Sequence, residues 1–240
     1  MSAALLNRIT AFGAAALIAS LCAAPVSAAP VTFDFTGSND QGAIGNTRTY
    51  TSGGVTVTVT AWSYLTDFQP GALGRWSLGL GVCSTAEIAS QGCTSPEHQV
   101  DNDGARDYLL FQFSSPVDPL SLSITTVNNA DLDVSYWVGT VTLPSDKLQN
   151  DTIAALGTRG FGSRLDNDYS GSAASRTVAL TSGFVNGLLF GARDGSTNDA
   201  FKVAGLIVDK PNLTVPEPAS MLMFGFAALG IAPRLRRRLR

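Results

Sequence analysis

The stretch Gly54–Leu65 reads GVTVTVTAWSYL, and from Val55 to Thr60 it alternates strictly between valine and threonine. Successive side chains of a β-strand point to opposite faces of the sheet, so this alternation places the valines on one face and the threonines on the other. Both residue types are β-branched, which favours strands over helices. The stretch therefore predicts a strand with one face turned to a hydrophobic core.

Similar short apolar or alternating stretches recur along the middle of the chain, separated by clusters of Gly, Asn, Asp, Ser and Pro that are typical of turns. They are Val31–Gly37, Arg75–Val82, Asp107–Ser114, Leu120–Val127, Leu132–Val141, Arg176–Ser182, Gly187–Ala192 and Phe201–Val208. The only helical candidate among them is a turn over Thr85–Ala89, and no internal repeat is evident. This pattern predicts an all-β fold, an antiparallel β-sandwich or jelly-roll-like single domain.

The first 28 residues have the features of a secretory signal peptide. Arg8 precedes an apolar run over Ile9–Ala24, Pro25 ends the run, and Val26-Ser27-Ala28 fits the small-residue rule for signal peptidase. We therefore expect an N-terminal signal helix that is cleaved after Ala28. The alternative is a permanent N-terminal anchor, which the short apolar run and the lack of stop-transfer charges after it disfavour.

A second targeting segment occupies the last 26 residues, 215–240. It opens with Val215, Pro216, Glu217 and Pro218, and the prolines keep this part extended. The apolar run Ala219–Pro233 follows with 15 residues, about 22 Å as a helix against a hydrocarbon core of roughly 30 Å. Five arginines end the chain: Arg234, Arg236, Arg237, Arg238 and Arg240. By the positive-inside rule they retain the tail in the cytoplasm, so the segment predicts a transmembrane helix with the bulk of the chain exported.

The order of these elements resembles the PEP-CTERM sorting signal of Gram-negative bacteria, the substrate of exosortase, a membrane cysteine transpeptidase. The resemblance covers residues 215–240, and the signal peptide at the other terminus accompanies it. It implies an inner-membrane intermediate, cleavage near Pro216–Pro218, loss of the tail, and transfer to the cell surface, the outer membrane or an extracellular polysaccharide matrix. The alternative is an ordinary C-terminal anchor that is never cut.

Residues 29–214 remain between the two signals, a length that suits one domain with a real core. They contain 10 Lys and Arg against 18 Asp and Glu, a net charge of −8, whereas the whole chain carries −3. Nucleic-acid binding needs clustered cations to displace counterions from phosphate, so we expect no nucleic-acid partner. An acidic domain of this kind is compatible with binding of divalent cations.

Cys83 and Cys93 are the two cysteines of this domain. In an exported chain an even pair predicts a disulfide. A metal-binding or redox pair is the alternative, but the spacing is not C-x-x-C and no second pair exists. The bond would stiffen one short loop.

The stretch Pro96–Phe113 is the most chemically suggestive one, because it places several oxygen ligands and one imidazole directly before a strong strand. These residues are Glu97, His98, Asp101, Asn102, Asp103 and Asp107. Calcium binds six to eight hard oxygens, which Asp101, Asn102, Asp103 and Asp107 could supply. The spacing is not that of an EF-hand, because Gly104 stands in the fourth position of the loop. An Asx-rich turn whose side chains bond local amides is the alternative.

Other candidate sites are weaker. The acidic pairs Asp131/Asp133, Asp166/Asp168 and Asp194/Asp199 suit a cation or a sugar hydroxyl, and equally suit solvated turns. The aromatic residues Trp62, Tyr64, Trp76, Tyr136 and Trp137 are either a sugar-stacking platform or core, and their strand context favours core. His98 is the only histidine, and neither G-x-S-x-G nor H-E-x-x-H occurs.

These observations favour an exported, non-enzymatic surface protein with a structural or adhesive role, which is a substrate of signal peptidase and of an exosortase-type enzyme. The first alternative is a carbohydrate- or calcium-binding module, which requires exposed aromatic side chains or an ion at Asp101–Asp107. The second is a polysaccharide-acting hydrolase, which requires two carboxylates facing each other across a cleft.

Overall fold

Strand β3 (Val55–Tyr64) contains the valine–threonine stretch and lies between β2 (Thr47–Ser52) and β8 (Arg106–Thr126). This arrangement comes from a computed structural model that describes residues 29–91, 93, 98–126, 130–143, 147–195 and 198–211. Val55, Val57 and Val59 are buried as the alternation predicts. Every strand pair in the described part of the chain is antiparallel, which confirms the prediction of an antiparallel, mostly-β domain.

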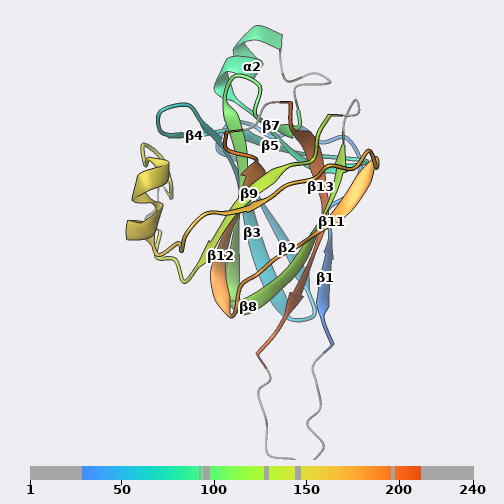
Figure 1. Cartoon of the computed structure of the whole chain (residues 1–240), viewed down its shortest axis with the longest axis vertical. Coiled ribbons are helices and arrows are strands. Elements are labelled where there is room, and N and C mark those ends of the chain that lie inside the picture. The colour runs from blue at the N-terminus through green and yellow to red at the C-terminus, as the bar shows by residue number, and fades with distance from the viewer. Residues whose placement is uncertain are drawn as a thin grey trace, which may run out of the picture. The chain divides into compact units, whose positions relative to one another are not determined.

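The 13 strands of the described chain form one continuous hydrogen-bonded network, which divides into two sheets that share β8 (Figure 1). Sheet A contains β1 (Val31–Asp34), β5 (Ala72–Trp76), β6 (Gly79–Cys83), β7 (Val100–Asp101), β11 (Ser175–Ala179) and β13 (Ala200–Asp209). Sheet B contains β2, β3, β4 (Phe68–Pro70), β9 (Val134–Gly139), β10 (Leu165–Asn167) and β12 (Val185–Ala192). The main core draws its side chains from both sheets, including Val57 and Phe111 of sheet B and Leu122 and Leu206 of sheet A.

Strand β8 has 21 residues and pairs in turn with strands of both sheets. Its first half, up to Val117, pairs with β3 and β12 of sheet B, and its second half, from Asp118, pairs with β13 and β11 of sheet A. The sequence predicted two separate strands here, Asp107–Ser114 and Leu120–Val127, and that prediction was wrong. Ser114–Pro116 carry turn-forming residues, but the chain continues as one strand because each half finds a different partner.

A second, smaller core covers the outer face of sheet B. Leu110 of β8, Trp137 of β9 and Leu189 of β12 pack there against Leu156 of the 3-10 helix η1 (Ile153–Arg159). Sheet B is therefore buried on both faces at these strands, which explains the continuous apolar runs that show no alternation. Thr152 caps η1 by accepting a hydrogen bond from the Ala155 N–H.

The predicted strand Arg75–Val82 is a hairpin in the structure, formed by β5 and β6. Gly79 has φ 126°, a conformation that suits glycine, and a Cβ there would collide with the Val203 carbonyl of β13. The sequence prediction missed this turn because Ser77 and Gly79 stand singly among apolar residues and form no cluster of turn residues.

Helix α2 (Thr85–Gln91) follows β6 and confirms the predicted helical turn over Thr85–Ala89. Cys83, the last residue of β6, forms the predicted disulfide with Cys93, with 5.9 Å between the Cα atoms. The bond ties the segment that contains α2 back to sheet A.

The described chain enters and leaves the domain at one place. Val31 of β1 pairs with Val208 of β13, so the two ends of the described chain lie side by side. Figure 1 shows this end of the domain opposite α2 and β7. The predicted signal helix and the predicted transmembrane helix lie outside the described residues, and no helix within the described ranges is long and apolar enough to cross a membrane.

Candidate functional site

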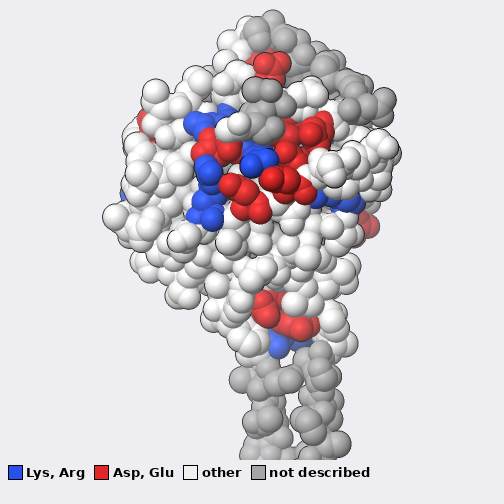
Figure 2. All heavy atoms as spheres, in the orientation of Figure 1, with Lys and Arg blue, Asp and Glu red and all other residues white. Residues whose placement is uncertain are grey.

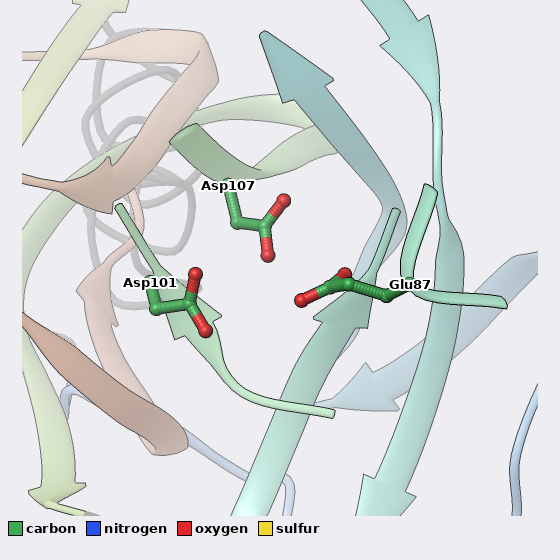
Figure 3. Close-up of side chains that lie close together, drawn as sticks. All are labelled: Glu87, Asp101 and Asp107. Atoms are coloured by element: carbon green, nitrogen blue, oxygen red, sulfur yellow. The ribbon is translucent and has the colours of Figure 1, made fainter. Parts of the chain in front are cut away.

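Three carboxylates, Glu87, Asp101 and Asp107, converge at the α2 end of the domain and form what we call the carboxylate cluster (Figure 3). Each offers an oxygen atom, and these oxygens all lie within 4.8 Å of one another. Asp101 and Asp107 are buried, with 4% and 1% of their surface exposed, and Glu87 is half-buried. Residues from a helix and two strands thus share one small volume.

Local structure fixes the position of each carboxylate. Glu87 belongs to a capping box: the Ser84 N–H donates to Glu87 Oε2, and the Glu87 N–H donates to Ser84 Oγ. Asp101 stands on β7, opposite Ala200 of β13. Asp107 stands on β8 and accepts a 2.7 Å hydrogen bond from the hydroxyl of Ser63, its partner on β3.

Burial and mutual repulsion act together on the two aspartates. Burial, and next the negative charge of Glu87, raise the pKa of Asp101 to about 7. Burial, followed by the charges of Asp101 and Glu87, also raises the pKa of Asp107 well above its usual range. Among the described residues no lysine or arginine forms an ion pair with either aspartate, and Asp107 Oδ2 is buried without a hydrogen-bond donor.

The four residues predicted as calcium ligands are separated by the fold. Asp101 and Asp107 come together, but Asn102 turns away and donates a 2.6 Å hydrogen bond to Asp199 Oδ2. The Asp103 N–H donates to Asp101 Oδ1, as in an Asx turn. Glu97 lies outside the described residues. Calcium binding by this loop stays a prediction. The side chain that lies beside Asp101 and Asp107 is that of Glu87, not those of Asn102 and Asp103.

Sequence reasoning missed Glu87, although a signal for its position exists. Ser84-Thr85-Ala86-Glu87 has the S-x-x-E pattern of a capping box at the start of a helix. The pattern locates Glu87 on the first turn of α2. It does not reveal that β7 and β8 carry two more carboxylates to the same place.

A second acidic group, Asp131, Asp133 and Asp199, also brings three carboxylate oxygens within 4.8 Å of one another. Here positive charge is already present, because Arg193 pairs with Asp133 at 3.3 Å and with Asp168 at 2.6 Å. Nearby, Arg106 forms an ion pair with Asp194, and Arg164 forms ion pairs with both Asp166 and Asp194. Figure 2 shows acidic and basic side chains intermixed in one region of the surface.

An open pocket of about 400 Å³ lies beside this second group. Polar residues dominate its lining, which consists of Thr126, Ala130, Asp131, Tyr169, Ser170, Gly171, Ser172, Ala173 and Asn198. Tyr169 supplies an aromatic ring over which the Arg176 guanidinium lies at 4.8 Å. Hydroxyl, amide and carboxylate groups around one ring form a surface that suits a sugar.

Most of the aromatic residues considered for sugar stacking are core. Trp62, Trp76, Tyr136 and Trp137 are all buried, and Tyr64 is half-buried beneath the Arg106 guanidinium. The interpretation as core is therefore confirmed for those four. His98 packs edge-on against Trp76, with 4.3 Å between the ring centroids.

Comparison with known proteins concerns the C-terminal segment. Residues 214–238 match the model of the PEP-CTERM protein-sorting motif. The chain carries this motif. The PEP-CTERM motif implies processing by an exosortase, and proteins that carry it are exported and sorted to the cell surface. No curated protein matches the chain.

The PEP-CTERM motif begins three residues beyond Pro211, where the described chain ends. The predicted processing residues Val215, Pro216, Glu217 and Pro218 fall within the match, as do Arg234, Arg236, Arg237 and Arg238. Arg240 falls outside it. All of these residues, like the predicted signal peptide, lie outside the described residues.

Proposed function

We propose that this chain is a non-enzymatic structural or adhesive protein of the cell surface, built as a β-sandwich and displayed by one end. The pairing of β1 with β13 carries the proposal, because it brings the entry and exit of the domain together next to the sorting motif. Within the domain, α2 and β7 lie at the end opposite the paired β1 and β13 termini (Figure 1), so attachment through the C-terminus would leave that end free for contacts.

The short connection supports the same proposal. Only a few residues separate the last strand, β13, from the start of the motif at residue 214. Before processing, the domain therefore stays close to the membrane. After cleavage near Pro216–Pro218, the same short segment would join the domain to its surface acceptor and leave the far end free for contacts.

The test compares the protein purified from its native host with a variant in which Pro216, Glu217 and Pro218 are replaced by alanine. Mass spectrometry of the wild type should show a chain that starts at Ala29 and ends near Pro216–Pro218, in the surface fraction. The variant should retain Arg240 and stay in the inner membrane. An intact Arg240 in the wild type would contradict processing and leave a tethered surface protein.

The structural or adhesive role has its own test in a strain that lacks the protein. We expect weaker attachment between cells or to the matrix, restored by the wild type and not by the triple-alanine variant. Restoration by the variant would show that the role does not need sorting, and unchanged attachment would contradict the role itself.

A carbohydrate-binding module is the second candidate, and the pocket beside Tyr169 is the observation that favours it. Replacing Tyr169 by alanine should weaken retention on the host's extracellular polysaccharide without changing the site of cleavage. Equal retention of wild type and variant would remove this candidate. Among the described residues that line the pocket, Asp131 is the one carboxylate, whereas a hydrolase of the usual kind needs two across a cleft.

A further inference from the structure

We propose that Glu87, Asp101 and Asp107 bind one calcium ion, which fastens the disulfide-closed α2 segment to the end of the domain. The inference does not depend on the structural or adhesive role. It rests on the convergence of three carboxylates from α2, β7 and β8, and on the burial of Asp107 with one oxygen unpartnered.

The distances suit a single ion. Oxygen ligands lie about 2.3–2.6 Å from calcium, so two ligands of one ion are at most about 5 Å apart. The three carboxylate oxygens of the cluster lie within 4.8 Å of one another. Figure 3 shows the carboxyl group of Asp107 pointing into the space that Asp101 and Glu87 also face.

The charge of the cluster also calls for a cation. Burying an ionised carboxylate is unfavourable unless a partner compensates for the lost hydration. Asp101 and Asp107 are buried together, and none of the ion pairs among the described residues includes either of them. Asp107 Oδ1 is satisfied by the Ser63 hydroxyl, while Asp107 Oδ2 is buried and has no donor. A cation supplies the missing partner for that atom.

The donor set indicates calcium among the common cations. All three side chains offer hard carboxylate oxygens, whereas zinc and copper favour histidine or cysteine ligands. Magnesium demands near-ideal octahedral geometry, whereas calcium accepts the irregular geometry of carboxylates that come from three separate elements. Export also fits, because calcium sites of extracellular modules bind in the range of about 10⁻⁴–10⁻³ M.

The second acidic group is a weaker candidate for the same reasons. Arg193 already pairs with Asp133, and the Asn102 amide donates to Asp199 Oδ2. A cation there would compete with a resident positive charge. The carboxylate cluster has no such competitor at Asp101 or Asp107 among the described residues.

Binding would have a structural consequence for α2. The capping box holds Glu87 on the first turn of the helix, and the Cys83–Cys93 disulfide closes the segment around it. An ion shared with β7 and β8 would join this segment to both sheets, since β7 pairs in sheet A and the first half of β8 pairs in sheet B. Calcium would then hold the α2 segment more firmly against both sheets than the disulfide alone does.

The experiment uses the full-length protein in detergent, treated with EDTA and dialysed, with thermal unfolding followed by circular dichroism. Calcium at a hundredfold excess over its dissociation constant should raise Tm by about 5–10 °C. Magnesium at the same concentration should raise it by less than half as much. Calorimetric titration should give one site per chain.

Variants locate the ion. Asp107→Asn should abolish the calcium-dependent rise in Tm, and Glu87→Gln, which changes a half-buried residue, should weaken binding at least tenfold. Asp118→Asn is the matched control, because Asp118 also lies on β8 and accepts a serine hydroxyl, that of Ser182. This control should keep the full response.

Several results would overturn the proposal. No calcium response in the wild type would mean that the carboxylates are neutralised by protons. An undiminished response in both Asp107→Asn and Glu87→Gln, or a response lost in Asp131→Asn instead, would place the ion elsewhere. An equal or larger response to magnesium would overturn the assignment to calcium.

Discussion

Opening the Cys83–Cys93 disulfide should destabilise the protein by a predictable amount. The two cysteines are separated by 10 positions, and closing a loop of this length in the unfolded chain is worth about 3 kcal/mol in the chain-entropy model. For a domain of this size, 1 kcal/mol corresponds to a shift in Tm of about 2–4 °C. We therefore expect reduction to lower Tm by about 6–12 °C.

The assay compares thermal unfolding of the wild type and of the double variant Cys83→Ala/Cys93→Ala, each with and without dithiothreitol. Alanine is the better replacement because Cys83 and Cys93 are buried, and serine would bury two hydroxyl groups. Dithiothreitol should lower the Tm of the wild type and leave that of the variant unchanged. Reduced wild type isolates the effect of the crosslink, since both thiol side chains remain in place.

The reasoning would be refuted by a shift of less than about 2 °C on complete reduction of the wild type. Such a result would mean that the unfolded chain already holds this loop closed, or that the α2 segment unfolds before the rest of the domain. Free-thiol titration of the unreduced protein supplies the control that the disulfide was present at the start.

Three further predictions concern the interior. Leu110→Ala should lower the free energy of unfolding by about 2–5 kcal/mol in urea titrations, because Leu110 is fully buried in the second core; a loss below about 1 kcal/mol would contradict that packing. Gly79→Ala should lower the free energy of unfolding by more than Gly54→Ala. Both glycines have positive φ, but of the two only Gly79 faces a backbone carbonyl, that of Val203. Equal losses in the two variants would contradict the close approach of Gly79 to Val203. Burial lowers the pKa of Lys202 to about 7 in the folded protein, against 10.5 in the unfolded chain. Between these pH values the unfolded chain binds a proton on Lys202 that the folded protein lacks. The free energy of unfolding should therefore rise with pH across that window, by at most about 5 kcal/mol. Lys202→Met should abolish this rise, and its persistence in the variant would assign it to another group.

The local pattern of the sequence was enough for several features. Alternation over Val55–Thr60 predicted a strand and its buried face, because side-chain direction in a strand depends only on position. The even pair Cys83 and Cys93 predicted the disulfide, because residues 29–214 contain only these two cysteines and therefore offer one pairing. The order of Pro-Glu-Pro, apolar run and arginines predicted the sorting motif, because a sorting enzyme reads a contiguous segment.

Tertiary structure alone decided the rest. The union of two predicted strands into β8 depends on partners, since pairing with β3, β12 and β13 keeps the chain extended across a stretch with turn-forming residues. Leu109 is buried in the main core, and the burial of its neighbour Leu110 depends on η1, which covers the outer face of sheet B. Nothing near Asp101 and Asp107 in the sequence points to Glu87, because the contact forms between elements whose spacing along the chain carries no periodic signal. Local propensity and contiguous motifs are encoded residue by residue, whereas the carboxylate cluster exists only once the helix and both sheets have packed.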